Sequence, residues 1–231
     1  SSAASDVYKR QSFNSFLIVP TSQRGSQAKN NYYNMHGAHL AFDDNVQYMA
    51  YYYPMSTGGS GQGSIVFVSR SGSSWTFRDI IATNDWSGTS SSIFFGASGM
   101  EMNATGDKLV ASDGQQAQAG TGGNGQVATY TRSGNNWSAT QSNILFGSYG
   151  YSNVNSPGGT RFGEGIAMTK DGQYLVVTET GYSPVQSQVN GRSRSTARIK
   201  TFQWNSGTSS WDLHSNIDNI VGLEGDDNAS Y

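Results

Sequence analysis

FGEGIAMTKDGQYLVVTET, Phe162 to Thr180, is the most informative stretch of this sequence, because FGASGMEMNATGDKLVASD, Phe95 to Asp113, resembles it. The apolar positions align: Met100, Met102 and Leu109 in one stretch correspond to Ile166, Met168 and Leu175 in the other. A more degenerate third copy carries Leu40, Phe42 and Met49. The first aligned positions are 40, 100 and 166, a period of 60 and then 66 residues. Repetition at this scale predicts an array or a propeller.

Each copy predicts four short strands. In the last copy the first strand is Ile166–Met168, a tight turn follows at Asp171-Gly172, and the second strand is Tyr174–Thr178, buried on both faces. An alternating third strand leads to a Ser-Gly turn, and a fourth strand starts at a tryptophan: Trp75, Trp137 or Trp211. The sequence therefore predicts an all-β protein made of β-propeller blades, each a four-stranded antiparallel sheet.

The repeats divide the chain into four parts. Residues 1–35 hold the outer strand of a preceding blade, Phe13–Val19, and residues 1–11 fit no repeat and read as a non-native scar. Blade repeats occupy 36–94, 95–161 and 162–231, and the last includes the lead-in to a further blade. Since propellers have about 4–8 blades, we expect an incomplete ring of three full blades with partial blades at both ends.

Composition excludes several classes of protein. The net charge is −2 and only 13% of residues are charged, so there is no basic footprint for nucleic acid. No apolar run is long enough to insert into a membrane, and cysteine is absent. Low charge, abundant small polar residues and three sequons favour a secreted or cell-surface glycoprotein. The N-linked glycans are predicted at Asn103, Asn136 and Asn228, the first two at loop tips.

The motifs resemble the FG-GAP repeat, which forms the propeller head of integrin α chains. Phe95-Gly96 and Phe162-Gly163 match the FG element, and His36-Gly37 is a degenerate version. The resemblance implies a propeller on a secreted or surface protein. The sequence lacks the family's GAP element, and of its calcium loop retains only Asp171 in one copy and the segment 103–107 in another. We therefore expect no cofactor, with calcium at Asp171 as the alternative.

Candidate chemistry centres on two acids at one repeat position. Asp113 and Glu179 follow their second strands at the place where the first copy has Tyr53. The two carboxylates could hold a cation or act as an acid/base pair, or be solvated strand ends, which we favour. The tyrosines at 51, 52 and 53 could stack on sugars or fill the space between blades. His36 and His39 occupy degenerate repeat positions, which explains them better than a metal site.

These observations favour a non-enzymatic structural or adhesion protein, a building block of a filament, coat or cell-surface assembly. A carbohydrate-binding lectin or glycan-cleaving enzyme is the alternative. The expected partners are other protein chains or further blades. Exposed end faces would carry Met100, Met102, Ile166 and Met168. Phe13–Val19 would pair with a strand outside these residues or with Ile217–Val221 of a neighbouring copy.

Overall fold

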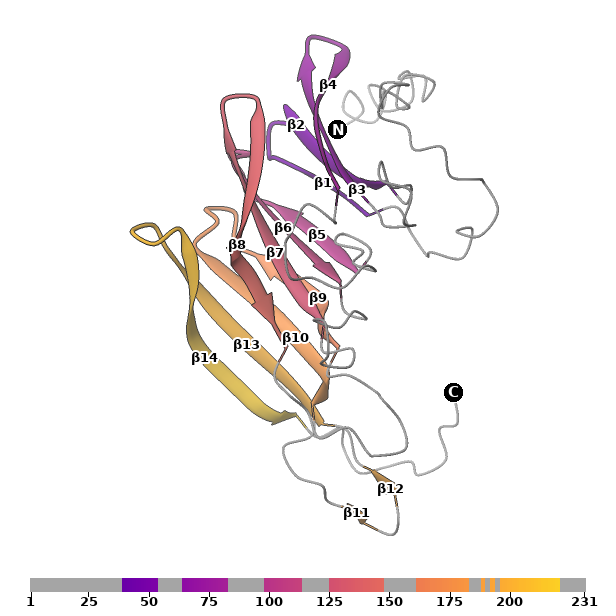
Figure 1. The fold of residues 1–231 in the computed structure, drawn as a ribbon, viewed down its shortest axis with the longest axis vertical. Coiled ribbons are helices and arrows are strands. Elements are labelled where there is room, and N and C mark those ends of the chain that lie inside the picture. The colour runs from indigo at the N-terminus through magenta and orange to yellow at the C-terminus, as the bar shows by residue number, and fades with distance from the viewer. Residues whose placement is uncertain are drawn as a thin grey trace, which may run out of the picture.

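The computed structural model describes residues 39–53, 64–82, 98–113, 125–147, 161–182, 188–189, 192–193 and 196–220. Within these ranges all regular elements are strands, which form three four-stranded antiparallel sheets and one small hairpin. Figure 1 shows the three sheets following one another along the long axis. The predicted all-β class, with four antiparallel strands in each repeat, is confirmed.

Each sheet comes from one repeat. The first sheet contains β1 (Leu40–Phe42), β2 (Tyr48–Tyr53), β3 (Ser64–Ser71) and β4 (Ser74–Ala82). The second sheet contains β5 (Gly99–Met102), β6 (Lys108–Asp113), β7 (Gln126–Ser133) and β8 (Asn136–Phe146). The third sheet contains β9 (Phe162–Met168), β10 (Tyr174–Tyr182), β13 (Thr196–Asn205) and β14 (Ser210–Ile220). The small hairpin of β11 (Gln188–Val189) and β12 (Arg192–Ser193) lies between β10 and β13 in the chain and was not predicted.

The turns follow the glycine pattern of the sequence. Gly72 and Gly134 have φ values of 60° and 61° in the hairpins that lead to the fourth strands. Gly106 and Gly172 have φ values of 65° and 67° between the first and second strands. This left-handed region costs glycine little and other residues more. The glycines of the sequence therefore mark these four turns.

The sheets pack face to face, and two hydrophobic clusters fill the two junctions. We call the face of each sheet that bears the residue equivalent to Leu109 its front, and the opposite face, which bears the equivalent of Val110, its back. The back of the first sheet packs on the front of the second, with Phe67 and Leu109 among the buried residues. The back of the second sheet packs on the front of the third, with Val110 and Leu175 buried. The first strands also contact each other, β1 with β5 and β5 with β9.

This packing corrects two expectations. Met100, Met102, Ile166 and Met168 do not line exposed end faces, because they belong to or pack against the clusters between the sheets. The predicted second strand Tyr174–Thr178 is not buried on both faces: Leu175 and Val177 are fully buried, but Tyr174 is 39% exposed. The difference arises because Tyr174 lies on the back of the third sheet, which no fourth described sheet covers.

The first strand of the third sheet is longer than predicted. It begins at Phe162 rather than Ile166, because pairing resumes after a bulge in β9: Val177 pairs with Ile166 and Glu179 with Phe162, so three residues of β9 lie opposite Thr178. Among the residues described, there is no helix of the length and hydropathy needed to span a membrane. Phe13–Val19, His36 and the proposed scar at 1–11 lie outside the described residues, so their predictions stay untested.

Candidate functional site

The two strand-end acids are buried, which corrects the prediction that they are solvated. Asp113 is 2% exposed and Glu179 is fully buried. Glu179 forms ion pairs with two cations on β13: its Oε2 lies 3.3 Å from Lys200 Nζ and 3.9 Å from Arg198 Nη1. A buried carboxylate is tolerated when it is paired in this way. Glu179 is thus part of a structural ion cluster inside the third sheet.

Asp113 and Glu179 belong to different sheets, and strand β9 lies at the junction between them. Asp113 pairs in register with Gln126, Gly125 bridges to Phe162, and Phe162 pairs with Glu179. The backbone pairs therefore connect the two acids through β7 and β9. Within the described ranges, no three histidine or acidic side chains gather as a metal site would require. His39 is among these residues, while its predicted partner His36 is not.

In the turn after each first strand, the side chain of the first turn residue accepts hydrogen bonds from the backbone at the end of the turn. Asp43 Oδ1, Asn103 Oδ1 and Thr169 Oγ1 each accept hydrogen bonds from two backbone N–H groups, four and five residues further along. Asp, Asn and Thr favour turns because their short side chains can make such bonds. These three residues occupy one repeat position, a signal that was present in the sequence.

The same turns contain the two remnants of the calcium loop. Thr169 donates to Asp171 at 2.5 Å, and the backbone N–H of Gln173 donates at 3.0 Å. These bonds lower the pKa of Asp171. In the second repeat, burial would raise the pKa of Asp107, but hydrogen bonds from Asn103 and Thr105, together with the charges of Lys108 and Arg132, lower the pKa. Both carboxylates accept hydrogen bonds from their own turns, so protein donors hold them in place.

The predicted glycan sites differ in their surroundings. Asn136 starts β8 in an exposed hairpin, as predicted. Asn103 lies in the predicted turn, but it is only 4% exposed, and its Nδ2 donates to Asp107 at 2.6 Å and Thr105 at 3.0 Å. The prediction of an open loop tip at Asn103 is therefore wrong. Asn228 lies outside the described residues.

We expect native material to carry a glycan at Asn136 and none at Asn103. A sugar on Asn103 Nδ2 would replace the donor that holds Asp107 and would meet the neighbouring turn at Gly172. Site-resolved mass spectrometry of tryptic glycopeptides measures both occupancies in one sample. Occupied Asn103 in folded protein would contradict the structure, and unmodified Asn136 would remove support for a secreted protein.

The three tyrosines proposed for sugar stacking do not form one surface. Tyr52 is 3% exposed and belongs to the cluster between the first and second sheets. Tyr51 points to the opposite face, where it packs against Met49, Val66 and Val68. The side chain of Tyr53 lies outside the described set. Packing between sheets, the favoured interpretation, therefore holds for Tyr52, and a platform that includes it is excluded.

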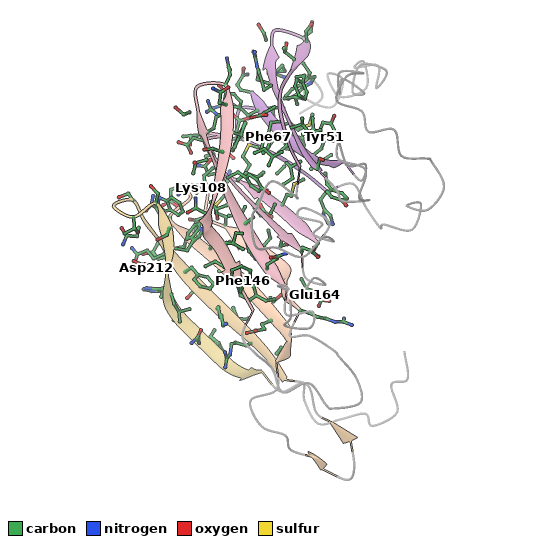
Figure 2. The ribbon with its side chains drawn as sticks, in the orientation of Figure 1. Tyr51, Phe67, Lys108, Phe146, Glu164 and Asp212 are labelled. Atoms are coloured by element: carbon green, nitrogen blue, oxygen red, sulfur yellow. The ribbon has the colours of Figure 1, made fainter. Side chains whose placement is uncertain are left out.

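The junctions hold cation–aromatic pairs that sequence reasoning missed. Between the first and second sheets, Arg132 Cζ lies 3.7 Å from the Tyr48 ring centroid. Between the second and third, Lys108 Nζ lies 3.9 Å from the Trp204 ring centroid and donates to Gly172 O at 2.7 Å. Phe67 and Lys108, which lie at these two junctions, are labelled in Figure 2. Tyr48 and Lys108 are equivalent in the repeat, as are Arg132 and Trp204, so the signal was a matched pair of positions.

The buried Lys108 predicts a stability that rises with pH. Burial lowers the pKa of Lys108 from 10.5 to about 8. Between these two values the unfolded chain binds more protons than the folded one, so the free energy of unfolding increases as pH rises from 8 towards 10.5. We expect Lys108→Met to remove this rise. Urea unfolding of both proteins at pH 7.5 and 9.5 measures it, and an identical pH dependence in the two proteins would contradict the assignment.

Comparisons with known proteins show a distant likeness to solved structures. No protein-family model matches the chain, and no curated protein matches it. Among solved structures, the chain is similar to one from Bacteroides fragilis NCTC 9343 described as "a putative 6-phosphogluconolactonase", with a TM-score of 0.46 and 14% identity. The match covers 78% of this chain and 38% of that chain. This chain therefore spans less than half of that protein's length.

Proposed function

We propose that this chain is a non-enzymatic structural or adhesion module of a secreted or cell-surface assembly, built as a propeller-like arc of FG-GAP-type blades. The observation that carries the proposal is the state of the third sheet. The backs of the first and second sheets are each buried by the next sheet, whereas the back of the third retains exposed apolar side chains such as Ile217, which is 55% exposed. Exposed apolar faces of this kind mark binding sites for other proteins.

The polar groups support a structural role over a glycan-cleaving one. Glu179 is fully buried and compensated by Lys200 and Arg198, so its carboxylate has no access to a substrate. A general acid or base must lie within hydrogen-bond reach of the substrate atom it serves. The burial of Tyr52 likewise removes the centre of the proposed sugar-stacking cluster. The low charge of the chain and the exposed sequon at Asn136 support a secretory route.

Photocrosslinking tests the proposal. A benzoylphenylalanine at Ile199, on the back of the third sheet, should give a protein adduct when the chain is irradiated in the cells that make it. The same group at Thr208, in the exposed hairpin before β14, is the matched control and should give none. Absence of a protein adduct at 199, together with glycan-array binding that Tyr51→Ala abolishes, would favour the lectin alternative instead.

A further inference from the structure

The two junctions between sheets follow one contact scheme. Each junction contains one cation–aromatic pair between equivalent repeat positions. Arg132 of the second sheet lies over Tyr48 of the first, and Lys108 of the second sheet lies over Trp204 of the third. The order is reversed between the two: the earlier sheet supplies the ring at the first junction and the cation at the second. The attraction between a cation and an aromatic face is the same whether the earlier or the later sheet supplies the cation.

A second element of the scheme is the tryptophan that opens each fourth strand. Trp137 stacks on Phe67 with ring centroids 4.5 Å apart. Its equivalent Trp211 donates from Nε1 to Thr129 Oγ1 at 2.8 Å, and Thr129 stands where the first sheet has Phe67. The tryptophan of the later sheet therefore contacts one residue on the back of the earlier sheet. It stacks on a ring at the first junction and donates a hydrogen bond to a hydroxyl at the second.

The turns after the first strands form the third element, a ladder of backbone hydrogen bonds with one direction. Asp44 N–H donates to Ala104 O at 3.3 Å, and Ala104 N–H donates to Lys170 O at 2.7 Å. These three residues share one repeat position. Gly172 packs closely against Asn103 of the earlier turn, and Gly106 packs against Tyr48. Continued in the same direction, the ladder places Lys170 N–H opposite the carbonyl of a fourth turn.

The back of the third sheet carries residues at the same repeat positions as those that the second sheet uses to contact the third. Tyr174, Val176, Ile199 and Thr201 occupy the positions of Lys108, Val110, Val127 and Thr129 in the second sheet. Those four are 7%, 0%, 0% and 0% exposed, whereas Tyr174 is 39% exposed and the other three are partly exposed. Tyr174 offers a ring where the second sheet offers a cation, and Thr201 offers the hydroxyl that Thr129 uses for its tryptophan.

We propose that this back face is the docking surface for the front of a fourth four-stranded sheet of the same repeat, carried by the partner in the assembly. The partner sheet would place an arginine or lysine, at the position of Arg132, over the Tyr174 ring. Its tryptophan, at the position of Trp137, would donate to Thr201. This inference rests on the proposed function and specifies the partner's chemistry; the continuity with two existing junctions carries it.

A tandem protein supplies the probe. A second copy of residues 95–161, which contains Gly106, Arg132 and Trp137, is fused after Tyr231 of the full chain. The connection from β14 to the added first strand then has 15 residues (221–231 followed by 95–98), against the 16 of segment 83–98 between β4 and β5. We expect hydroxyl-radical oxidation of Tyr174 and Ile217 to fall about tenfold relative to the unfused chain. We expect docking of the added sheet on the third sheet to weaken about tenfold in Tyr174→Lys but not in Tyr174→Phe.

The outcomes separate this inference from the proposed function. Equal oxidation of Tyr174 in the tandem and unfused chains would overturn the docking surface. Equal behaviour of Tyr174→Lys and Tyr174→Phe would overturn the cation contact. A photocrosslink from position 199 to a protein without this repeat would overturn the inference while leaving the interaction module intact.

Discussion

Replacing Gly125 with alanine is expected to lower the free energy of unfolding by about 4 kcal/mol or more. Single substitutions rarely cause so large a loss unless they strain the backbone or disrupt the core. Gly125 has a φ of 77° and forms the bridge from the second sheet to Phe162 of the third. A Cβ there would lie 2.1 Å from Phe162 O and 2.6 Å from Phe162 N. The clash is with backbone, so β9 itself would have to move away from the second sheet.

Gly134→Ala is the matched control. Gly134 has a φ of 61°, and a Cβ there meets nothing within 4 Å. It therefore isolates the cost of the left-handed backbone, about 1–2 kcal/mol. Denaturant unfolding of both variants measures the difference. Equal losses would mean that the close approach of β9 to Gly125 does not hold the second and third sheets together.

Glu179→Gln is expected to cost about 3–5 kcal/mol, because it leaves Lys200 and Arg198 without the carboxylate that compensates them. The side chains of these two cations are only 11% and 12% exposed. Glu164→Gln is the control: its partner Arg161 is 60% exposed, and such a surface pair contributes about 0–1 kcal/mol. Similar losses in the two variants, measured by urea unfolding, would contradict a structural ion cluster at Glu179.

Much of the sheet architecture could be predicted because its signals are local. Glycines mark the turns, tryptophans mark the fourth strands, and alternation marks the third, so the order of the four strands in each repeat was predicted. The start of the first strand of the third sheet was misplaced because the bulge between Phe162 and Ile166 depends on pairing with β10, which no local pattern encodes.

The candidate site could not be predicted as well, because burial depends on contacts between sheets. Asp113 and Asn103 have the residue types of exposed strand ends and turns, yet neighbouring elements cover them. The compensating cations of Glu179 lie on another strand and carry no motif. The cation–aromatic pairs were missed for the same reason: Lys108 and Trp204 belong to different repeats.

A comparison of side-chain oxidation in the native assembly and in the purified chain tests whether the back of the third sheet binds a protein partner. Tyr174 and Ile217 are 39% and 55% exposed in the chain described here, and Leu213, also 55% exposed, lies on the front of the same sheet as an internal reference. We predict that hydroxyl radicals modify Tyr174 and Ile217 readily in the purified chain and that both are protected in the native assembly relative to Leu213. Equal modification of Tyr174 and Ile217 in the two preparations would contradict protein binding at this face.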